Sequence, residues 1–254
     1  MKFKGILAIV IGICGALSAP GPAAAGQTNV AVAANFTRAA QEIATLFNLK
    51  TGHVAVMSFG ATGQLYTQIM QSAPFEIFLA ADEARPKKAV DEGLAAADSV
   101  FTYAIGKLVL WSRDPALVTG PETLDKAAFA KLAYCNPVGA PYGAAAVETL
   151  RALRLYDKLQ SKLVQGESVS QAFQFVDTGN AELGFVALSQ LVEIGGGSRW
   201  IVPPNLYTPI RQDAVLLKRG VDNPAAIGFM TFLKGPDARA IIEKYGYGVD
   251  AEHR

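Results

Sequence analysis

Four stretches of the sequence place neutral polar residues where a strand is expected to pass into a helix. Asn35 follows a small apolar run, Thr62 lies in a glycine-flanked turn, Tyr142 precedes Gly143, and residues 168–170 read Ser-Val-Ser. A helix N-terminus leaves backbone N–H groups without partners and favours negative charge. One such junction is typical of a simple cap or turn. Several of them around one point could hold a dianion without a counter-charge.

The elements around the first junctions predict a parallel sheet. Val30–Ala33 reads as a buried strand, Asn35 as an N-cap, and Phe36 to Phe47 carry apolar residues at helical spacing. Two further strand–helix units follow, with strands at 54–59 and 75–80 and helices at 64–71 and 82–93. Strands that alternate with helices favour right-handed parallel crossovers. Ligands lie beyond the carboxyl ends of such strands, where Asn35 and Thr62 are expected.

The second half of the sequence predicts another α/β lobe, which the chain enters through Lys107–Trp111. We expect helices at 121–132 and through 153, a helix after 166, and strands at 132–135, 159–164 and 182–188. A return segment at 207–211 leads to a strand at 214–217 and two helices within 223–246. The prediction is two lobes, each a mostly parallel sheet flanked by helices, joined by two crossing hinge segments. Lobe 1 comprises 26–104 plus 212–254, and lobe 2 comprises 105–211.

Composition indicates a globular protein that does not bind nucleic acid. The 254 residues are 51% hydrophobic and 18% charged, which suffices for a sizeable core. Lys and Arg number 23 against 22 Asp and Glu, and no basic stripe stands out. Nucleic acid and anionic membrane surfaces are therefore not expected as partners.

Residues 1–25 are predicted to be a cleavable signal peptide. Lys2 and Lys4 precede an apolar stretch at 5–17, and small residues at 23–25 suit cleavage. Lipidation of Cys14 is a competing interpretation, although Ile13 does not suit a lipoprotein signal. The mature chain keeps one cysteine, Cys135, so no internal disulfide can form. We expect a soluble periplasmic protein.

The sequence offers little for catalysis. His53 and His253 are placed like surface residues, and Cys135 ends an apolar strand without a nearby histidine partner. No cluster has metal-ligand spacing, and neither a nucleophile elbow nor a phosphate loop is present. Glu148 and Glu167 are the carboxylates nearest the lobe 2 junctions, and an exported enzyme would need such an acid/base pair. Their position near helix starts favours solvated residues instead.

From Val30 to Gly248 the sequence resembles the periplasmic molybdate-binding proteins of ABC transporters. The resemblance rests on Ala33–Thr37, Ser58–Leu65, Ala73–Asp82, Asn136–Gly143, Leu183–Ala187, Phe232–Pro236 and Tyr245–Tyr247. It implies a type II periplasmic-binding-protein fold and no enzyme activity. It also implies a tetrahedral molybdate or tungstate in the interlobe cleft, no cofactor, and an ABC permease as partner. We expect a monomer.

The resemblance also assigns four ligand-binding positions. It implies that Asn35, Thr62 and Tyr142 bind the oxyanion and that Val169 donates its backbone N–H at a helix start. Many members have a tyrosine where this chain has Ala187. Our hypothesis is that Tyr142 supplies a substitute donor. Other tetrahedral oxyanions, such as sulfate or thiosulfate, remain alternatives that depend on cavity size. Phosphate is disfavoured, because these junctions contain no Asp to accept its proton.

Overall fold

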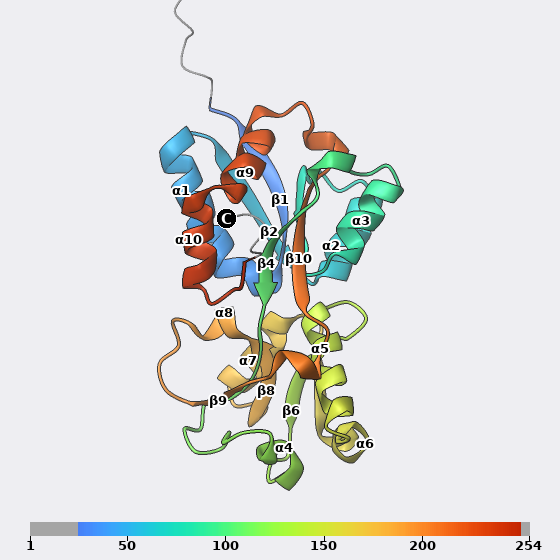
Figure 1. Cartoon of the computed structure of the whole chain (residues 1–254), viewed down its shortest axis with the longest axis vertical. Coiled ribbons are helices and arrows are strands. Elements are labelled where there is room, and N and C mark those ends of the chain that lie inside the picture. The colour runs from blue at the N-terminus through green and yellow to red at the C-terminus, as the bar shows by residue number, and fades with distance from the viewer. Residues whose placement is uncertain (1–24, 250–254) are drawn as a thin grey trace, which may run out of the picture.

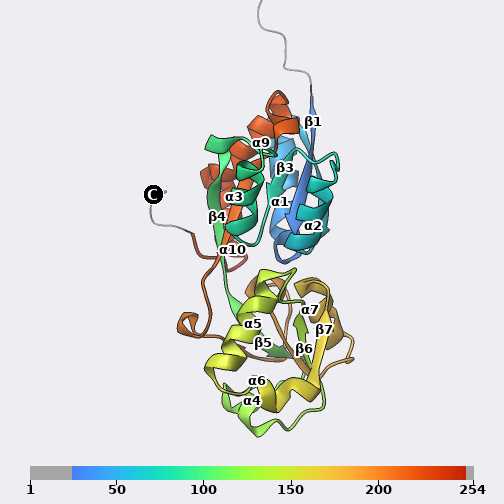
Figure 2. The same ribbon diagram turned by 90° about the vertical axis from the view of Figure 1, so that its right-hand side faces the viewer.

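Alternating strands and helices build two α/β lobes, stacked one above the other in Figures 1 and 2. The computed structural model describes residues 25–249, so residues 1–24 of the predicted signal peptide lie outside the described residues. Each lobe contains one five-stranded sheet. No helix within residues 25–249 is both long enough and apolar enough to cross a membrane.

Lobe 1 surrounds a sheet with the strand order β2-β1-β3-β10-β4. Helices α1, α9 and α10 pack on one face and α2 and α3 on the other (Figure 1). Its strands are β1 (Gln27–Ala33), β2 (Val54–Gly60), β3 (Ile77–Leu79), β4 (Phe101–Gly106) and β10 (Ile210–Leu216). Its α-helices are α1 (Thr37–Thr51), α2 (Thr62–Met70), α3 (Ala84–Asp91), α9 (Pro224–Lys234) and α10 (Pro236–Lys244).

Lobe 2 surrounds a sheet with the strand order β7-β6-β8-β5-β9. A single apolar core includes Trp111, whose ring stacks on Phe173 at 5.1 Å between centroids. Its strands are β5 (Leu108–Ser112), β6 (Leu132–Cys135), β7 (Leu163–Gly166), β8 (Leu183–Ala187) and β9 (Ser198–Ile201). Its α-helices are α4 (Glu122–Lys126), α5 (Pro141–Ala152), α6 (Tyr156–Leu159), α7 (Val169–Asp177) and α8 (Leu188–Leu191).

Two crossing segments join the lobes, as predicted. The chain leaves the lobe 1 sheet after Gly106 and returns to it at Ile210. The predicted lobe boundaries, at 104/105 and 211/212, fall inside β4 and β10. The first crossing joins β4 to β5 through Lys107 alone, whereas the 3₁₀ turn η4 (Pro204–Leu206) lies between β9 and β10 in the second. Short crossing segments of this kind suit a hinge of few residues.

The expectation of mostly parallel sheets is confirmed, with one reversed strand in each: β10 in lobe 1 and β5 in lobe 2 run against the other four strands of their sheet. In each sheet two strand pairs are parallel and two are antiparallel, the latter being β10 with β3 and β4, and β5 with β8 and β9. The physical reason for the reversed strand is the double crossing. A strand that enters a sheet from the opposite lobe runs against the strands that are built by local βαβ crossovers.

Two predicted elements of lobe 2 differ from the structure. The helix expected at 121–132 stops at Lys126, and Ala127 has a left-handed φ of 53°. Lys162 Nζ donates to the carbonyl oxygens of Ala127 (2.8 Å) and Phe129 (2.5 Å), so a distant side chain satisfies this turn. The strand expected at 159–164 begins only at Leu163, because the preceding residues are helical.

Candidate oxyanion site

The four predicted site residues line one small cavity between the lobes, here called the interlobe cavity. Asn35 and Thr62 come from lobe 1, and Tyr142 and Val169 come from lobe 2. Most other lining residues are small, among them Ala33, Ala34, Gly60, Ala61, Ala81 and Ala140. None of the described residues that line it is charged. Its free volume is about 10 Å³, roughly the room that one water needs, so the lobes are closed on each other.

Three helix N-termini converge on the interlobe cavity. Thr62 is the first residue of α2, Tyr142 the second of α5, and Val169 the first of α7. Backbone N–H groups in a first helical turn have no acceptor within their own helix. The helix dipoles add partial positive charge at the same ends. The cavity is therefore suited to an anion, although it contains no cationic side chain.

Two hydroxyl groups add donors to this set. The N–H of Ala81 donates to Thr62 Oγ1 at 3.2 Å, and Gln212 Nε2 donates to the Tyr142 hydroxyl at 3.4 Å. A hydroxyl that accepts one bond still has its own proton to donate. Burial raises the pKa of Tyr142 well above its usual range, so this group stays protonated. Both hydroxyls can donate to an oxyanion.

Asn35 differs from its expected role as a helix N-cap. It lies inside a short 3₁₀ turn, η1 (Ala34–Phe36), and caps neither this turn nor α1. Its side-chain Nδ2 donates to Gln212 Oε1 (2.8 Å) and to the Tyr247 hydroxyl (3.0 Å). Gln212 is fully buried and needs such partners. The group that Asn35 offers to the cavity is therefore its backbone N–H, in the first turn of η1.

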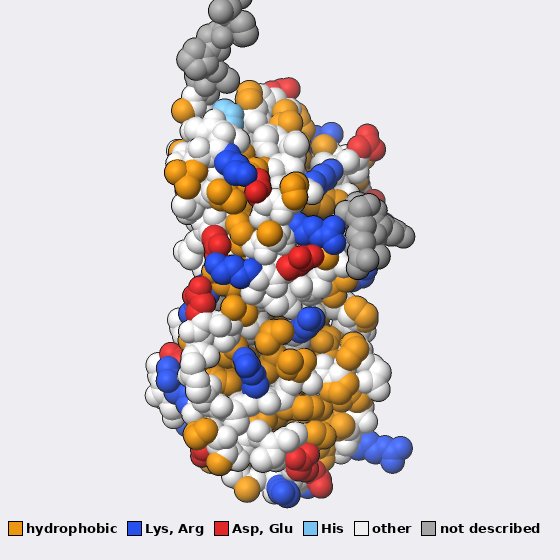
Figure 3. Space-filling view, turned by 60° about the vertical axis from the view of Figure 1, so that its left-hand side comes forward, with side chains coloured by type: hydrophobic (Ala, Val, Ile, Leu, Met, Phe, Trp, Pro, Cys, Tyr) orange, Lys and Arg blue, Asp and Glu red, His pale blue; other side chains and the backbone are white. Residues whose placement is uncertain are grey.

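The sequence does not predict the hydrogen bonds that join the two lobes. Ser170 Oγ donates to the Ala34 carbonyl (3.2 Å) and Ser189 Oγ to the Asn35 carbonyl (2.9 Å). On the other rim, the Gly63 N–H donates to the Gly139 carbonyl at 2.9 Å. Lone serines and glycines carry no sequence signal for such contacts. In the view of Figure 3 the surfaces of the two lobes meet across the waist of the molecule.

The residues considered for catalysis do not assemble at this cavity. Glu148 accepts a hydrogen bond from the Thr208 N–H at 2.6 Å, Glu167 is exposed, and neither lines the cavity. Burial raises the pKa of the Cys135 thiol to about 12. His53 accepts from the Gly26 N–H, whereas His253 lies outside the described residues. Within residues 25–249 no group of three or more His, Cys, Asp and Glu could hold a metal ion.

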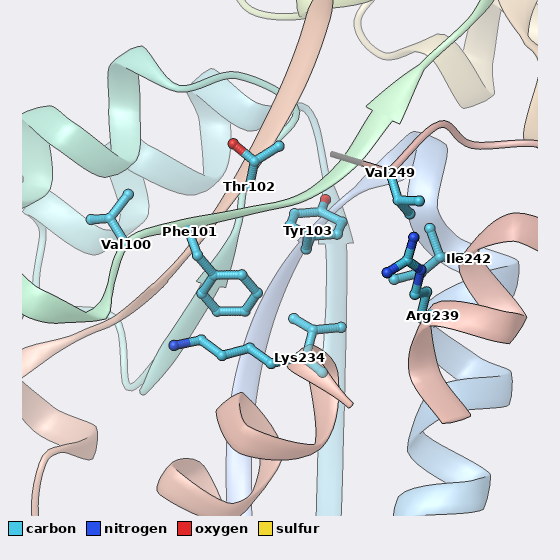
Figure 4. Close-up of a pocket in the computed structure, with 9 residues that line it drawn as sticks. Val100, Phe101, Thr102, Tyr103, Lys234, Arg239, Ile242 and Val249 are labelled. Atoms are coloured by element: carbon cyan, nitrogen blue, oxygen red, sulfur yellow. The ribbon is translucent and has the colours of Figure 1, made fainter. Parts of the chain in front are cut away.

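Larger cavities lie elsewhere on the molecule. One of about 510 Å³ opens beside the interlobe cavity, shares Asn35 and Ser168 with it, and adds Arg38 and Asp177. Another, of about 430 Å³, lies in lobe 1 between β4, α9 and α10, where Lys234 extends along the ring of Phe101 (Figure 4). Its walls include none of the four predicted residues.

Comparison with known sequences identifies close relatives. The profile of the family described as bacterial extracellular solute-binding protein matches residues 28–248. The molybdate-binding protein ModA of Rhodobacter capsulatus is 56% identical over 226 residues, which cover 89% of this chain and 90% of that protein. ModA of Azotobacter vinelandii is 55% identical over 231 residues, covering 89% and 92%.

Comparison with solved structures agrees with the comparison of sequences. The periplasmic molybdate-binding protein of Azotobacter vinelandii superposes with a TM-score of 0.85 and 42% identity, covering 88% of this chain and 99% of that chain. The prediction of a two-lobed type II periplasmic-binding-protein fold is thereby confirmed. The chain belongs to the bacterial extracellular solute-binding proteins, the family that includes the ModA molybdate-binding proteins.

Proposed function

We propose that this protein is the solute-binding component of an ABC importer and binds molybdate, and also tungstate, in the interlobe cavity. The observation that carries the proposal is the convergence of three helix N-termini and two hydroxyl donors on a cavity lined by no charged described residue. The relatives at 55% and 56% identity, both named molybdate-binding proteins, support the choice of ligand.

The chemistry of the donor set favours a fully deprotonated dianion. Oriented N–H and O–H groups can replace the hydration shell of the ion without a counter-charge. A protonated oxyanion would bring an O–H that needs an acceptor, and an unpaired buried donor costs about 1–3 kcal/mol. Because four oxygens need more room than one water, we expect the walls to shift outward slightly when the ion binds.

We also propose that Tyr142 provides the donor that Ala187 cannot. Ala187 ends β8, is fully buried, and donates its N–H to Gln190 Oε1 at 2.9 Å. Its methyl group cannot bind an oxyanion oxygen, whereas the Tyr142 hydroxyl keeps a proton for this purpose. Tyr142→Phe should weaken molybdate binding about tenfold or more, because one hydrogen bond to a charged group contributes about 1.5–3 kcal/mol.

The matched control for Tyr142 is Tyr134→Phe. The Tyr134 hydroxyl also lies in lobe 2, donating to Gln165 Oε1 at 2.9 Å, but does not line the interlobe cavity. Calorimetry measures the molybdate affinity of both variants. A loss of affinity in Tyr142→Phe alone would show that the Tyr142 hydroxyl contacts the ligand, since both variants lose a tyrosine hydroxyl from lobe 2. Equal molybdate affinity of Tyr142→Phe and wild type would eliminate the substitute-donor hypothesis.

The proposed transport role also implies a membrane partner and a cellular location for this protein. We infer export to the periplasm by the signal peptide at residues 1–25, a monomer that closes around its ion, and docking on an ABC permease in the inner membrane. Membership of a solute-binding family supports a transport role without catalysis. Closure would present the loaded form to the permease through a shift between two conformations.

Calorimetric titration of the dialysed mature protein with molybdate, tungstate and sulfate tests the proposal. We expect tight, near-stoichiometric binding of the first two and little response to sulfate. Equal or stronger binding of sulfate or thiosulfate would mean that the site binds oxyanions but that its cavity is not sized for molybdate. Binding of none of these ions, or turnover of a candidate substrate, would contradict the proposed function.

A further inference from the structure

The turn that carries Asn35 is held from the opposite lobe by two serine hydroxyls. Ser170 is the second residue of α7 and Ser189 the second of α8, so both belong to lobe 2. Their hydroxyls donate to the carbonyls of Ala34 (3.2 Å) and Asn35 (2.9 Å) in lobe 1. Each bond joins a lobe 2 side chain to the lobe 1 backbone, so both bonds require the lobes to be closed.

The bond from Ser170 acts on the peptide group that faces the interlobe cavity. The Ala34 carbonyl and the Asn35 N–H belong to the same peptide, and a trans peptide directs them to opposite sides. Because Ser170 binds the carbonyl side, it fixes the direction in which the Asn35 N–H points. A hydrogen bond to the carbonyl also polarises the peptide and makes its N–H a stronger donor.

The bond from Ser189 fixes the other end of Asn35. The Asn35 carbonyl also accepts from the Tyr247 hydroxyl at 2.7 Å, and that hydroxyl lies 2.9 Å from Ser189 Oγ. Asn35 Nδ2 in turn donates to the Tyr247 oxygen and to Gln212 Oε1. The side-chain amide nitrogen and the backbone carbonyl are thus held within the protein, and the backbone N–H remains for a ligand.

We propose that Ser170 is a positioning residue for the oxyanion, assisted by Ser189: lobe closure brings their hydroxyls to the Ala34 and Asn35 carbonyls and so aligns and strengthens the Asn35 N–H. The Asn35 N–H of lobe 1 is then correctly aligned only when lobe 2 has closed on it, although neither serine hydroxyl needs to touch the ion. This inference rests on the proposed function, since it assumes that the Asn35 N–H binds the molybdate.

The test compares Ser170→Ala, Ser170→Thr and Ser189→Ala with the control Thr178→Ala. Thr178 also donates its hydroxyl to a backbone carbonyl, that of Gln174 at 2.7 Å, but at the exposed end of α7 and within lobe 2. Molybdate affinity is measured by calorimetry, and the Asn35 amide proton is followed by NMR as molybdate is added. Thermal unfolding without ligand verifies that each variant is folded.

We expect Ser170→Ala and Ser189→Ala to weaken molybdate binding about two- to tenfold, the value of one neutral hydrogen bond. Ser170→Ala should also reduce the downfield shift of the Asn35 amide proton on molybdate addition. Ser170→Thr, which keeps the hydroxyl, should restore both, and Thr178→Ala should match wild type. Wild-type affinity and shift in Ser170→Ala would overturn this inference alone. Failure of the wild type to bind molybdate would overturn it together with the proposed function.

Discussion

The substitution Gly63→Ala isolates lobe closure from ligand contact. Gly63 is the second residue of α2, and its N–H donates across the cleft to the Gly139 carbonyl at 2.9 Å. A Cβ added there would lie 3.1 Å from Gly139 Cα and 3.2 Å from the Gly139 oxygen. It would also lie 3.2 Å from Arg85 Nη2, which donates to the Val138 carbonyl of lobe 2 at 2.8 Å. The backbone contacts all belong to lobe 2, so the clash exists only when the lobes are closed.

The magnitude follows from two opposing effects. Inside a helix alanine is favoured over glycine by up to about 1 kcal/mol, so lobe 1 itself should be unchanged or slightly stabilised. In the closed form Gly139 must move by a few tenths of an ångström, and overpacking of this kind costs about 1–3 kcal/mol. Taking about 1–2 kcal/mol for a rim contact, we expect the Kd for molybdate to rise roughly 5- to 30-fold.

The assay pairs thermal unfolding of the ligand-free protein with molybdate calorimetry. The matched control is Gly228→Ala in α9, where an added Cβ would meet only Phe47 and His53 at 3.8–3.9 Å. Gly228→Ala should keep wild-type affinity. Gly63→Ala should keep or raise the Tm without ligand and yet bind more weakly. An unchanged Kd in Gly63→Ala, with the Tm preserved, would refute the idea that the Gly63–Gly139 contact forms part of the ligand-bound state.

Three further predictions concern single groups. Thr62→Val keeps the shape but removes the hydroxyl and leaves the Ala81 N–H without its acceptor, so molybdate affinity measured by calorimetry should fall about tenfold or more; retained affinity would exclude the hydroxyl as a donor. Burial raises the pKa of the Asp213 carboxyl, so the wild type loses stability as the pH rises through that raised pKa. Asp213→Asn should therefore have the higher Tm at pH 7, and this advantage should disappear in acid, where wild-type Asp213 is protonated; an equal Tm at both pH values would contradict the sign. Because burial raises the pKa of Cys135 to about 12, a thiol reagent should modify it only after unfolding in urea, and rapid modification of the native protein would disprove its protection.

The local pattern of the sequence was sufficient to place most of the candidate site. Short apolar strands and helical spacing define the strand–helix junctions, and the positions of Thr62, Tyr142 and Val169 at helix starts follow from them. Parallel strands bring such junctions to one edge of a sheet, and the double crossing turns the two edges toward each other. That these residues bind the ion remains a prediction.

The parts that could not be predicted depend on contacts between distant residues. Asn35 has the sequence context of an N-cap, but its side-chain amide is bound by Gln212 and Tyr247, which lie 177 and 212 positions away. The helix expected at 121–132 ends early where Lys162 satisfies the carbonyls of the following turn. No local pattern encodes such partners, because a buried polar group selects them only once the chain has folded.

The division of donors between the lobes explains why a site without a cation could hold a dianion and also report its presence. Asn35 and Thr62 belong to lobe 1, and Tyr142 and Val169 to lobe 2, so neither lobe alone offers the full set. A ligand can shift an equilibrium only by its difference in affinity for the two states. In the proposed site, the closed state binds the ion more tightly than the open state because closure adds the donors of the second lobe. The same movement brings Ser170 to Ala34 and Gly139 to Gly63, so substitutions at the rim should change affinity without touching the ion.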